Sequence, residues 1–323
     1  MCVTGKGKSL KIACNKFASS KAGHNSRRGR DCDFRDINLL RMRKIMVSLT
    51  ACALAVVQRA ISMDPAPYVY DLPPPAIAHQ HFDSLFLEKF DEILLIGDVH
   101  GCYDELKILL ETNKAEKEKT LKICVGDLVN KGPKSQEVLN LFRNSNSMFS
   151  VRGNHDEVVL REYLNSRDPN YRLKENNTWI KNLSLEDIEY IKQLPFTISL
   201  PSLNAIIVHA GLVPGQPLEK NKPYDMIHMR NLVDVDYFWE GGLLPTENTT
   251  EGKPWASLWH GPQHVYFGHD AKRMLQKYSY ATGLDTGCVY GNWLTGLFIS
   301  GPREGNFVQV KALKVYSQPK SKN

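Results

Sequence analysis

The sequence lacks the paired cysteines of a disulfide-stabilised or zinc-finger protein. Its 323 residues include seven cysteines at irregular spacing, with no C-x-x-C pair among them. Small secreted domains depend on an even-numbered cysteine framework, and structural zinc sites depend on closely spaced pairs. We therefore expect a protein of a reducing compartment, without a disulfide scaffold or a zinc finger.

The sequence also lacks any apolar run of the roughly 18–20 residues that a membrane-spanning helix requires. Its formal net charge of +6 comes from one end of the chain. Residues 1–63 carry 13 Lys and Arg against 3 Asp and Glu, whereas the remainder carries 28 basic and 32 acidic side chains. Because the excess of positive charge is confined to this leader, we expect no broad DNA-binding face on the folded part. We predict neither a membrane span nor a DNA partner.

The basic leader, residues 1–63, is predicted to be a disordered or targeting segment. Within it, residues 42–59 resemble a signal peptide if translation begins at Met42, whereas the leader read from Met1 resembles a mitochondrial presequence or an inert tail. Three glycosylation sequons are about what chance gives in a chain rich in Asn. We expect a cytoplasmic protein, with mitochondrial targeting as the alternative and secretion disfavoured.

The rest of the chain divides into three parts. A proline-rich stretch predicts a linker over residues 64–84, because proline interrupts helices and interior strands. A folded domain is predicted over residues 85–313. A polar, basic and flexible tail is predicted over residues 314–323.

Within the domain, short apolar segments each end in a glycine-flanked polar residue. The segments 93–96, 121–125, 147–151, 205–208 and 265–267 precede, in this order, Asp98 with His100, Asp127, Asn154, His209 and His269. The first steps are 29 and 27 residues long, which is typical of strand–helix–strand units. Helices are predicted over residues 102–118, from a cap at Ser135, and over 185–194 from a cap at Ser184. Ligands bind where parallel strands end in α/β folds, so we expect these side chains to converge.

The predicted cluster combines carboxylate and amide oxygens with imidazole nitrogens. This donor set suits two divalent ions, which could be Mn, Fe, Zn, Co or Mg. Two ions about 3.5–4 Å apart generate hydroxide from water at neutral pH and hold the oxygens of an in-line phosphoryl displacement. Taken alone, each short motif is more often part of an ordinary loop than of a metal site. The ordered set of five favours a dinuclear metal site.

The motifs GDVHG (97–101), GD…G (126–132), GNH (153–155), HAG (209–211) and GH (268–269) resemble the signature of the calcineurin-like metallophosphoesterases. The resemblance covers about residues 90–300 and implies an α/β fold, a four-layer αββα sandwich with two central sheets. It implies that one ion is held by Asp98, His100 and Asp127. The other ion would be held by Asp127, Asn154, His209 and His269, with His155 as the general acid.

Within this family the chain is similar to the ApaH-like phosphatases, relatives of symmetrical bis(5′-nucleosyl)-tetraphosphatase. The similarity rests on GDVHGCYDEL (97–106), GDLVNKGP (126–133), GLDTGCVYG (283–291) and Asp156. Phosphoprotein phosphatases have Asp and Arg where this chain has Asn130 and Lys131. An Asp would hold a proton on the catalytic histidine, whereas Asn130 can only orient His155 by a hydrogen bond.

The presence of Asn130 in place of Asp affects which leaving group the substrate must have. A serine alkoxide needs a proton in order to leave, whereas a nucleotide phosphate, with a terminal pKa of about 6, needs it much less. We therefore expect cleavage of phosphoanhydride bonds in nucleoside polyphosphates such as diadenosine tetraphosphate, in RNA caps or in polyphosphate. The alternatives are a Ser/Thr phosphoprotein phosphatase on the same scaffold and a non-catalytic scaffold, although no ligand is missing from the motifs.

Three cations are candidates for binding substrate phosphate: Lys131, Arg230 and Arg152. For Arg152, which precedes the Asn154 motif, a structural role in holding the loop is the alternative. We expect a monomer that acts on a small phosphorylated substrate.

Overall fold

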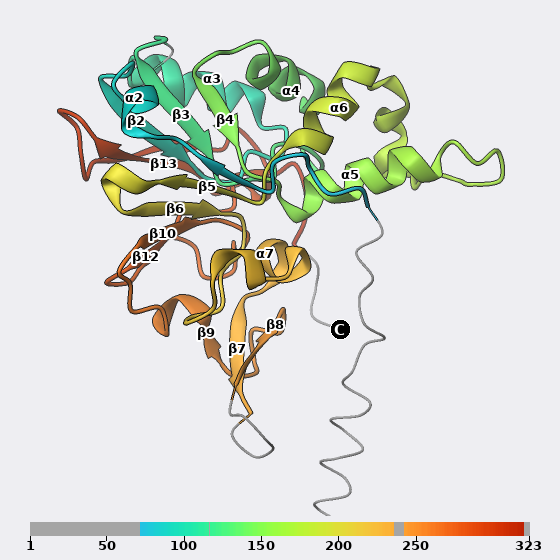
Figure 1. Ribbon diagram of the computed structural model, residues 1–323. Helices are drawn as coiled ribbons and strands as arrows, with labels where there is room; N and C mark the ends of the chain where they lie inside the picture. The colour runs from blue at the N-terminus through green and yellow to red at the C-terminus, as the bar shows by residue number, and fades with distance from the viewer. Residues whose placement is uncertain (1–71, 116, 236–241, 320–323) are drawn as a thin grey trace, which may run out of the picture. The chain divides into compact units, whose positions relative to one another are not determined.

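The structure, a computed structural model, describes residues 72–115, 117–235 and 242–319 (Figure 1). The predicted leader lies outside these ranges. Strand β1 (His79–His81) falls within the range predicted as a linker, where it forms the edge of a sheet by pairing with β5 (Thr197–Leu200). The last proline of the proline-rich stretch is Pro75. The residues after it are therefore free to extend as an edge strand.

The first three motifs follow neighbouring strands of a five-stranded sheet. Strands β2 (Glu92–Ile96), β3 (Thr120–Cys124) and β4 (Met148–Ser150) run parallel to one another, as their spacing predicts. On the other side of β2, the antiparallel strands β13 (Trp293–Ser300) and β14 (Phe307–Lys311) complete the sheet. Strands covered on both faces have few positions for polar side chains, which explains the apolar run in β2.

Helices α3 (Tyr103–Thr112) and α4 (Ser135–Arg143) cover one face of this sheet (Figure 1). Their apolar side chains pack with Leu94 and Ile96 of β2. Helix α3 ends six residues before its predicted end. Asn113 donates to the carbonyl oxygen of Leu109 at 2.8 Å, and the left-handed backbone of Lys114 (φ 51°) ends the helix.

A six-stranded sheet faces the first one. Ile198 and Ile207 of this second sheet pack against Leu95 and Ile123 of the first, so the two sheets share an apolar core. Strand β6 runs parallel to β10, and these two strands carry the last two motifs. The strand order is β1, β5, β6 (Ala205–Val208), β10 (His264–Phe267), β12 (Ala281–Gly283) and β11 (Gln276–Lys277).

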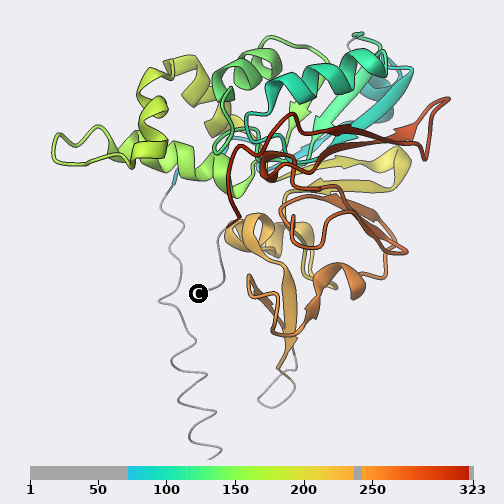
Figure 2. The same cartoon turned by 180° about the vertical axis from the view of Figure 1, so that it is seen from behind.

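The outer face of the second sheet is covered by short elements, so the predicted four-layer arrangement is confirmed (Figure 2). The fourth layer contains α7 (Pro223–His228), the 3-10 turn η4 (Trp255–Ser257) and a small sheet. That sheet has the order β8 (Leu243–Thr246), β7 (Asn231–Asp234) and β9 (Lys253–Pro254). The fourth layer is therefore less helical than the predicted one.

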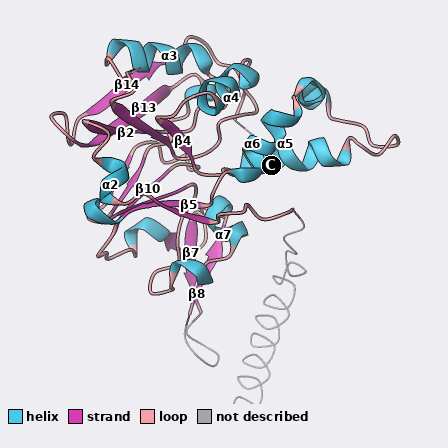
Figure 3. Ribbon diagram, turned by 45° about the horizontal axis from the view of Figure 1, so that its top comes forward, coloured by secondary structure: helices cyan, strands magenta, loops and turns pink. Residues whose placement is uncertain are grey.

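Helices α5 (Asn154–Asn165) and α6 (Leu185–Gln193), with η1 (Glu175–Asn182) between them, project beyond the end of the first sheet (Figure 3). The predicted cap of α6 is confirmed, because Ser184 Oγ accepts the backbone N–H of Asp187. No helix in the described ranges has the length and apolar character needed to cross a membrane. The remaining short helices are α2 (Ser84–Leu87), η2 (Pro201–Leu203), η3 (Leu218–Lys220) and η5 (Cys288–Tyr290).

Candidate metal centre

The six side chains predicted as metal ligands lie together where strands of both sheets end. Asp127 links two of them: its Oδ2 lies 3.3 Å from His100 Nε2 and its Oδ1 lies 3.4 Å from His209 Nε2. Asn154 Oδ1 lies 3.0 Å from His209 Nε2 and 3.1 Å from His269 Nδ1. The backbone N–H of His269 donates to Asp98 Oδ2 at 3.1 Å, across 171 residues of sequence. The structure therefore brings all six together.

Hydrogen bonds on the far side of two imidazoles decide which ring nitrogen faces this cluster. His209 Nδ1 lies 2.8 Å from the carbonyl oxygen of Val125, and His269 Nε2 lies 2.9 Å from that of His228. A carbonyl oxygen only accepts, so these nitrogens carry the protons and the opposite ones keep lone pairs. Both lone pairs point at Asn154 Oδ1, a contact between acceptors that a cation would relieve. Metal-binding histidines are oriented in the same way.

The third imidazole has a cationic side chain beside it. His100 Nδ1 lies 3.3 Å from the carbonyl oxygen of Val129, which leaves Nε2 to face the cluster. That nitrogen lies 3.0 Å from Lys131 Nζ, which donates to it. Lys131 also lies over the ring of Tyr290, 5.2 Å from its centre. A predicted phosphate-binding cation is thus in direct contact with a predicted metal ligand.

The electrostatics of the cluster fit divalent cations. Burial raises the pKa of Asp98 well above its usual range, and the carboxylates of Asp285 and Asp127 add to this rise. Burial would likewise raise the pKa of Asp127, but the His209 and His100 imidazoles hold it below its usual range. Burial also lowers the pKa of His100 and His269, which favours the neutral imidazole that binds metals. The Lys131 ammonium offsets only part of the charge of the buried carboxylates Asp98, Asp127 and Asp285, and two metal ions would supply the remainder.

The backbone around the cluster is held in an uncommon conformation. Among the residues that the structure describes, eight other than glycine have a positive φ, and five of these belong to the site. Such conformations persist where the surrounding structure over-determines them, and they concentrate at functional sites. The five are His100, Asp127, Asn130, Lys131 and His269, with φ between 46° and 75°.

Asp156, one of the residues on which the similarity to the ApaH-like phosphatases rests, is a positioning residue in the structure. It is fully buried, and its carboxylate accepts backbone N–H groups of Asp127 (3.0 Å), Gly153 (2.8 Å) and Val129 (3.3 Å). These bonds fix the Asp127 loop against the start of α5. Burial and the nearby Asp127 carboxylate raise its pKa to about 8, against the effect of the three donors.

Asp285 is a second buried carboxylate that sequence reasoning left without a role. It accepts the backbone N–H of Gly287 at 3.0 Å, and burial raises its pKa to about 6. Its negative charge helps to raise the pKa of Asp98. The GLDTG motif contained the signal, but the motif alone gave no reason to place Asp285 beside the predicted ligands.

His155 and Asn130 lie in contact, as the sequence predicts. Asn130 Nδ2 lies 3.3 Å from His155 Nδ1, while Asn130 Oδ1 accepts the backbone N–H of Lys131 at 2.8 Å. Because that oxygen is engaged, the amide presents its N–H to the imidazole, and His155 Nδ1 accepts. The neutral ring then carries its proton on Nε2. Ser135, predicted as a helix cap, instead accepts the N–H of Asn130 at 3.0 Å, and Lys134 occupies the N-cap position without a side-chain capping hydrogen bond.

Of the two predicted phosphate-binding arginines, only one lies at the cluster. Arg230 donates to the carbonyl oxygen of His269 at 3.4 Å and remains partly exposed. Arg152 is fully buried, donates to the carbonyl oxygen of Lys192 and lies 5.2 Å from the centre of the Phe196 ring. This geometry supports the structural alternative for Arg152 and corrects its assignment to phosphate.

Gly268, directly after β10, allows the backbone of the second sheet to approach Asp98 closely. A Cβ at this position would collide with Asp98 Oδ1. We expect Gly268→Ala to lower kcat about 100-fold, because displacing a catalytic group by about 1 Å costs roughly this much. Steady-state kinetics would test this. Gly305→Ala is the control for a glycine-to-alanine change away from the site: a Cβ in this exposed turn meets nothing within 4 Å, and its φ of 82° confines the strain of alanine to the turn itself. Equal turnover in the Gly268→Ala variant and the native protein would contradict the assignment.

Comparisons with known proteins agree with this geometry. The calcineurin-like phosphoesterase family model matches residues 92–286. A symmetrical bis(5′-nucleosyl)-tetraphosphatase from Coxiella burnetii and an asymmetrical one from Oceanobacillus iheyensis are each 29% identical, covering 63% of this chain and 87% of the relative.

Solved structures give the same result. One, of a protein proposed to be a diadenosine tetraphosphatase, is 33% identical, has a TM-score of 0.62 and covers 73% of this chain and 98% of its own. A serine/threonine phosphatase from Saccharomyces cerevisiae is 14% identical, has a TM-score of 0.50 and covers 75% of this chain and 85% of its own, and so shows the fold alone. The family model spans more than half of the chain, and the protein therefore belongs to the calcineurin-like phosphoesterases, a family of metal-dependent hydrolases.

Proposed function

We propose that the protein hydrolyses phosphoanhydride bonds of nucleoside polyphosphates at the cluster of six ligands. The contact between Asn130 and His155 carries this choice of bond. A neutral amide donates to the general acid at the position where a protein phosphatase has a carboxylate. The site is therefore suited to a leaving group that departs without full protonation.

The six side chains fit two divalent ions, one on Asp98, His100 and Asp127 and one on Asp127, Asn154, His209 and His269. The ions would lower the pKa of water and neutralise charge on the phosphate oxygens. The chain's own residues supply the positioning. Asp127 lies between the two ligand groups, and its loop is fixed by Asp156.

The second task of the chain is to orient the substrate. The Lys131 ammonium lies within 3.0 Å of His100, so it would contact a phosphate oxygen at the centre as a point charge. Arg230 lies on the His269 side and is partly exposed, so it would contact a phosphate further along the chain of a polyphosphate. His155 would donate its Nε2 proton in a hydrogen bond to the departing oxygen.

The relatives support nucleotide substrates, because two of them are named for bis(5′-nucleosyl) tetraphosphates. The competing function is that of a Ser/Thr phosphoprotein phosphatase. The fold permits it, since a serine/threonine phosphatase has the same architecture. Asn130 is the observation against it, because a seryl leaving group requires a proton that Asn130 does not hold on His155.

A substrate panel tests the proposal. The full chain would be assayed with added Mn²⁺ on diadenosine tetraphosphate, inorganic polyphosphate, capped RNA and a phosphoserine peptide. We expect kcat/KM to be at least about 100-fold higher on the best anhydride than on the phosphopeptide, since general acid catalysis contributes about 10²–10⁴-fold. Preference for the phosphopeptide would support a protein phosphatase, and inactivity on all four would support a non-catalytic scaffold.

A further inference from the structure

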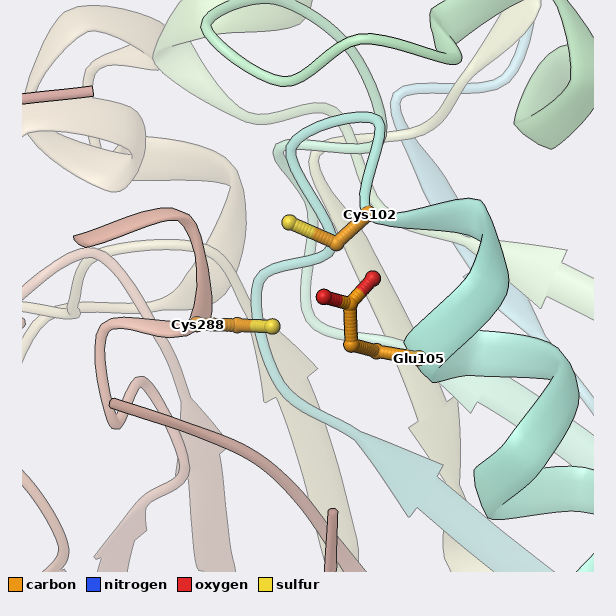
Figure 4. A group of neighbouring side chains, drawn as sticks. All are labelled: Cys102, Glu105 and Cys288. Atoms are coloured by element: carbon orange, nitrogen blue, oxygen red, sulfur yellow. The ribbon is translucent and has the colours of Figure 1, made fainter. Parts of the chain in front are cut away.

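Three metal-binding side chains converge at a place that the proposed reaction does not use. Cys102 and Glu105 come from the start of α3, and Cys288 begins η5 (Figure 4). The two sulfur atoms and a carboxylate oxygen all lie within 4.8 Å of one another. The three residues are 1% exposed or less. Two thiols and a carboxylate are thus enclosed together in the core.

The Glu105 carboxylate is only half satisfied by hydrogen bonds. Its Oε1 accepts the backbone N–H of Leu313 at 2.9 Å and the hydroxyl of Tyr316 at 2.8 Å. Its Oε2 is buried and has no hydrogen-bond partner. In Figure 4 the carboxylate group extends toward the two thiols. A buried carboxylate oxygen without a donor is costly, and a cation bound by the same three side chains would remove that cost.

The backbone favours negative charge at this place. Cys102 is the N-cap of the ten-residue helix α3, and its side chain makes no capping hydrogen bond. Glu105 lies in the first turn of the same helix. The positive end of the helix dipole stabilises an anion here, such as the Glu105 carboxylate. The contact with Cys288, burial and the Glu105 charge raise the pKa of the Cys102 thiol, so the thiols stay protonated until a cation replaces their protons.

We propose that Cys102, Glu105 and Cys288 bind one zinc-type cation at a site separate from the dinuclear centre. Zinc accepts both thiolate and carboxylate ligands, whereas the harder Mg²⁺ and Mn²⁺ favour oxygen ligands alone. The three side chains leave one tetrahedral position for a water molecule. Each thiol transfers its proton to solvent as its sulfur binds the ion, so two protons are released.

The position of this site gives it a structural task. Cys102 lies two residues after His100, and Cys288 lies three residues after Asp285. The ion would tie these two loops together. Through the bonds from Leu313 and Tyr316 to Glu105, it would also hold the C-terminal segment in place. It would hold the loop that carries His100, a predicted ligand, against the loop that carries Asp285, whose charge acts on Asp98.

Cobalt spectroscopy separates this site from the dinuclear centre. Thiolate ligands give Co²⁺ an intense near-ultraviolet charge-transfer absorption, whereas oxygen and nitrogen ligands do not. The full chain, with Cys2, Cys14, Cys32 and Cys52 replaced by Ser, would be produced in cobalt-supplemented medium. It would be kept in a phosphine reductant so that the thiols stay reduced. We expect a charge-transfer band corresponding to one thiolate-bound cobalt per chain.

Single substitutions in this background identify the residues that give rise to the band. Cys102→Ser and Cys288→Ser are expected to abolish it. Glu105→Gln is expected to retain it but to weaken cobalt binding at least about tenfold, since loss of even an outer ligand partner costs this much. Cys124→Ser is the matched control. The Cys124 thiol is also buried, but it faces the carbonyl oxygens of Gly97 and Gly126, so the band should persist. Two results would overturn the proposal: absence of the band in the background protein, which retains Cys102 and Cys288, or persistence of the band in Cys288→Ser.

A second measurement needs no substitution at Cys102, Glu105 or Cys288. With Mn²⁺ in excess at the dinuclear centre, the same background protein would be given one equivalent of Zn²⁺. Its zinc X-ray absorption spectrum would then be recorded. We expect sulfur neighbours at about 2.3 Å. A shell of oxygen and nitrogen alone would overturn the proposal, whatever the activity of the enzyme.

Discussion

Replacement of Asp127 by Asn is expected to lower kcat by about 10³-fold or more on every phosphorylated substrate. Within the described ranges, Asp127 is the one carboxylate in contact with imidazoles of both ligand groups, at 3.3 Å from His100 and 3.4 Å from His209. An amide offers one oxygen and no charge in its place. A catalytic metal ion supplies several kcal/mol, and each 1.4 kcal/mol is a factor of ten in rate. Steady-state kinetics with saturating Mn²⁺ would measure the loss.

Asp91→Asn is the matched control for this substitution. It makes the same chemical change at an exposed residue of the same domain, so it should leave kcat within about a factor of two. The Asp127→Asn variant should also release Mn²⁺ more readily than the native protein in equilibrium dialysis. Undiminished turnover in this variant would show that the cluster is not the catalytic centre.

Replacement of Asn130 by Asp is expected to shift the preference of the enzyme from anhydrides toward phosphate monoesters. The new carboxylate would accept from His155 Nδ1, which now faces an amide N–H at 3.3 Å. The imidazole could then hold a second proton and give one to a poor leaving group. We expect the ratio of kcat/KM for a phosphoserine peptide to that for diadenosine tetraphosphate to rise about tenfold or more, which is a fraction of the full effect of general acid catalysis.

Asn130→Ala distinguishes this effect from a disturbed loop. Alanine removes the contact with His155 and the bond to the Lys131 backbone, without adding charge. It should lower turnover of both substrates and leave their ratio within about threefold. A ratio that is the same in the Asn130→Asp variant and in the native protein would remove the physical basis for preferring anhydrides.

The sequence was informative where a strand ends in a polar motif. Asp98, Asp127 and Asn154 follow parallel neighbours in one sheet, so their convergence could be predicted from spacing alone. His209 and His269 follow strands of a different sheet. Spacing did not determine that sheet or its distance from the first. The family resemblance supplied the two-sheet arrangement, and the structure confirms it.

The supporting groups could not be predicted, because their roles depend on contacts between loops. Asp156 acts through backbone N–H groups on two elements, and Ser135 binds the Asn130 N–H rather than its own helix. Both are polar residues at helix starts, where a local capping role is the ordinary interpretation. Arg152 is the opposite case, in which a role at the site was predicted for a residue that has a structural one. It lies next to a site motif, but its guanidinium is directed into the core.

The proximity of Cys102 and Cys288 could not be predicted from the sequence either. Cys102 and Cys288 follow glycines in two different motifs, and their spacing predicts neither a disulfide framework nor a zinc finger. Folding brings their sulfur atoms next to Glu105. These three residues share no recurring motif, unlike the ligands of the dinuclear centre, so the tertiary structure was needed to show that they lie together.

The most direct test of the dinuclear centre is a manganese titration of the metal-free enzyme. The full chain would be stripped with a chelator, and its hydrolysis of diadenosine tetraphosphate would be measured as Mn²⁺ is restored. We expect activity to vanish on stripping and to return in proportion to two tightly bound Mn²⁺ ions per chain. Activity that survives complete removal of metal, or that is fully restored by a single ion, would contradict this expectation.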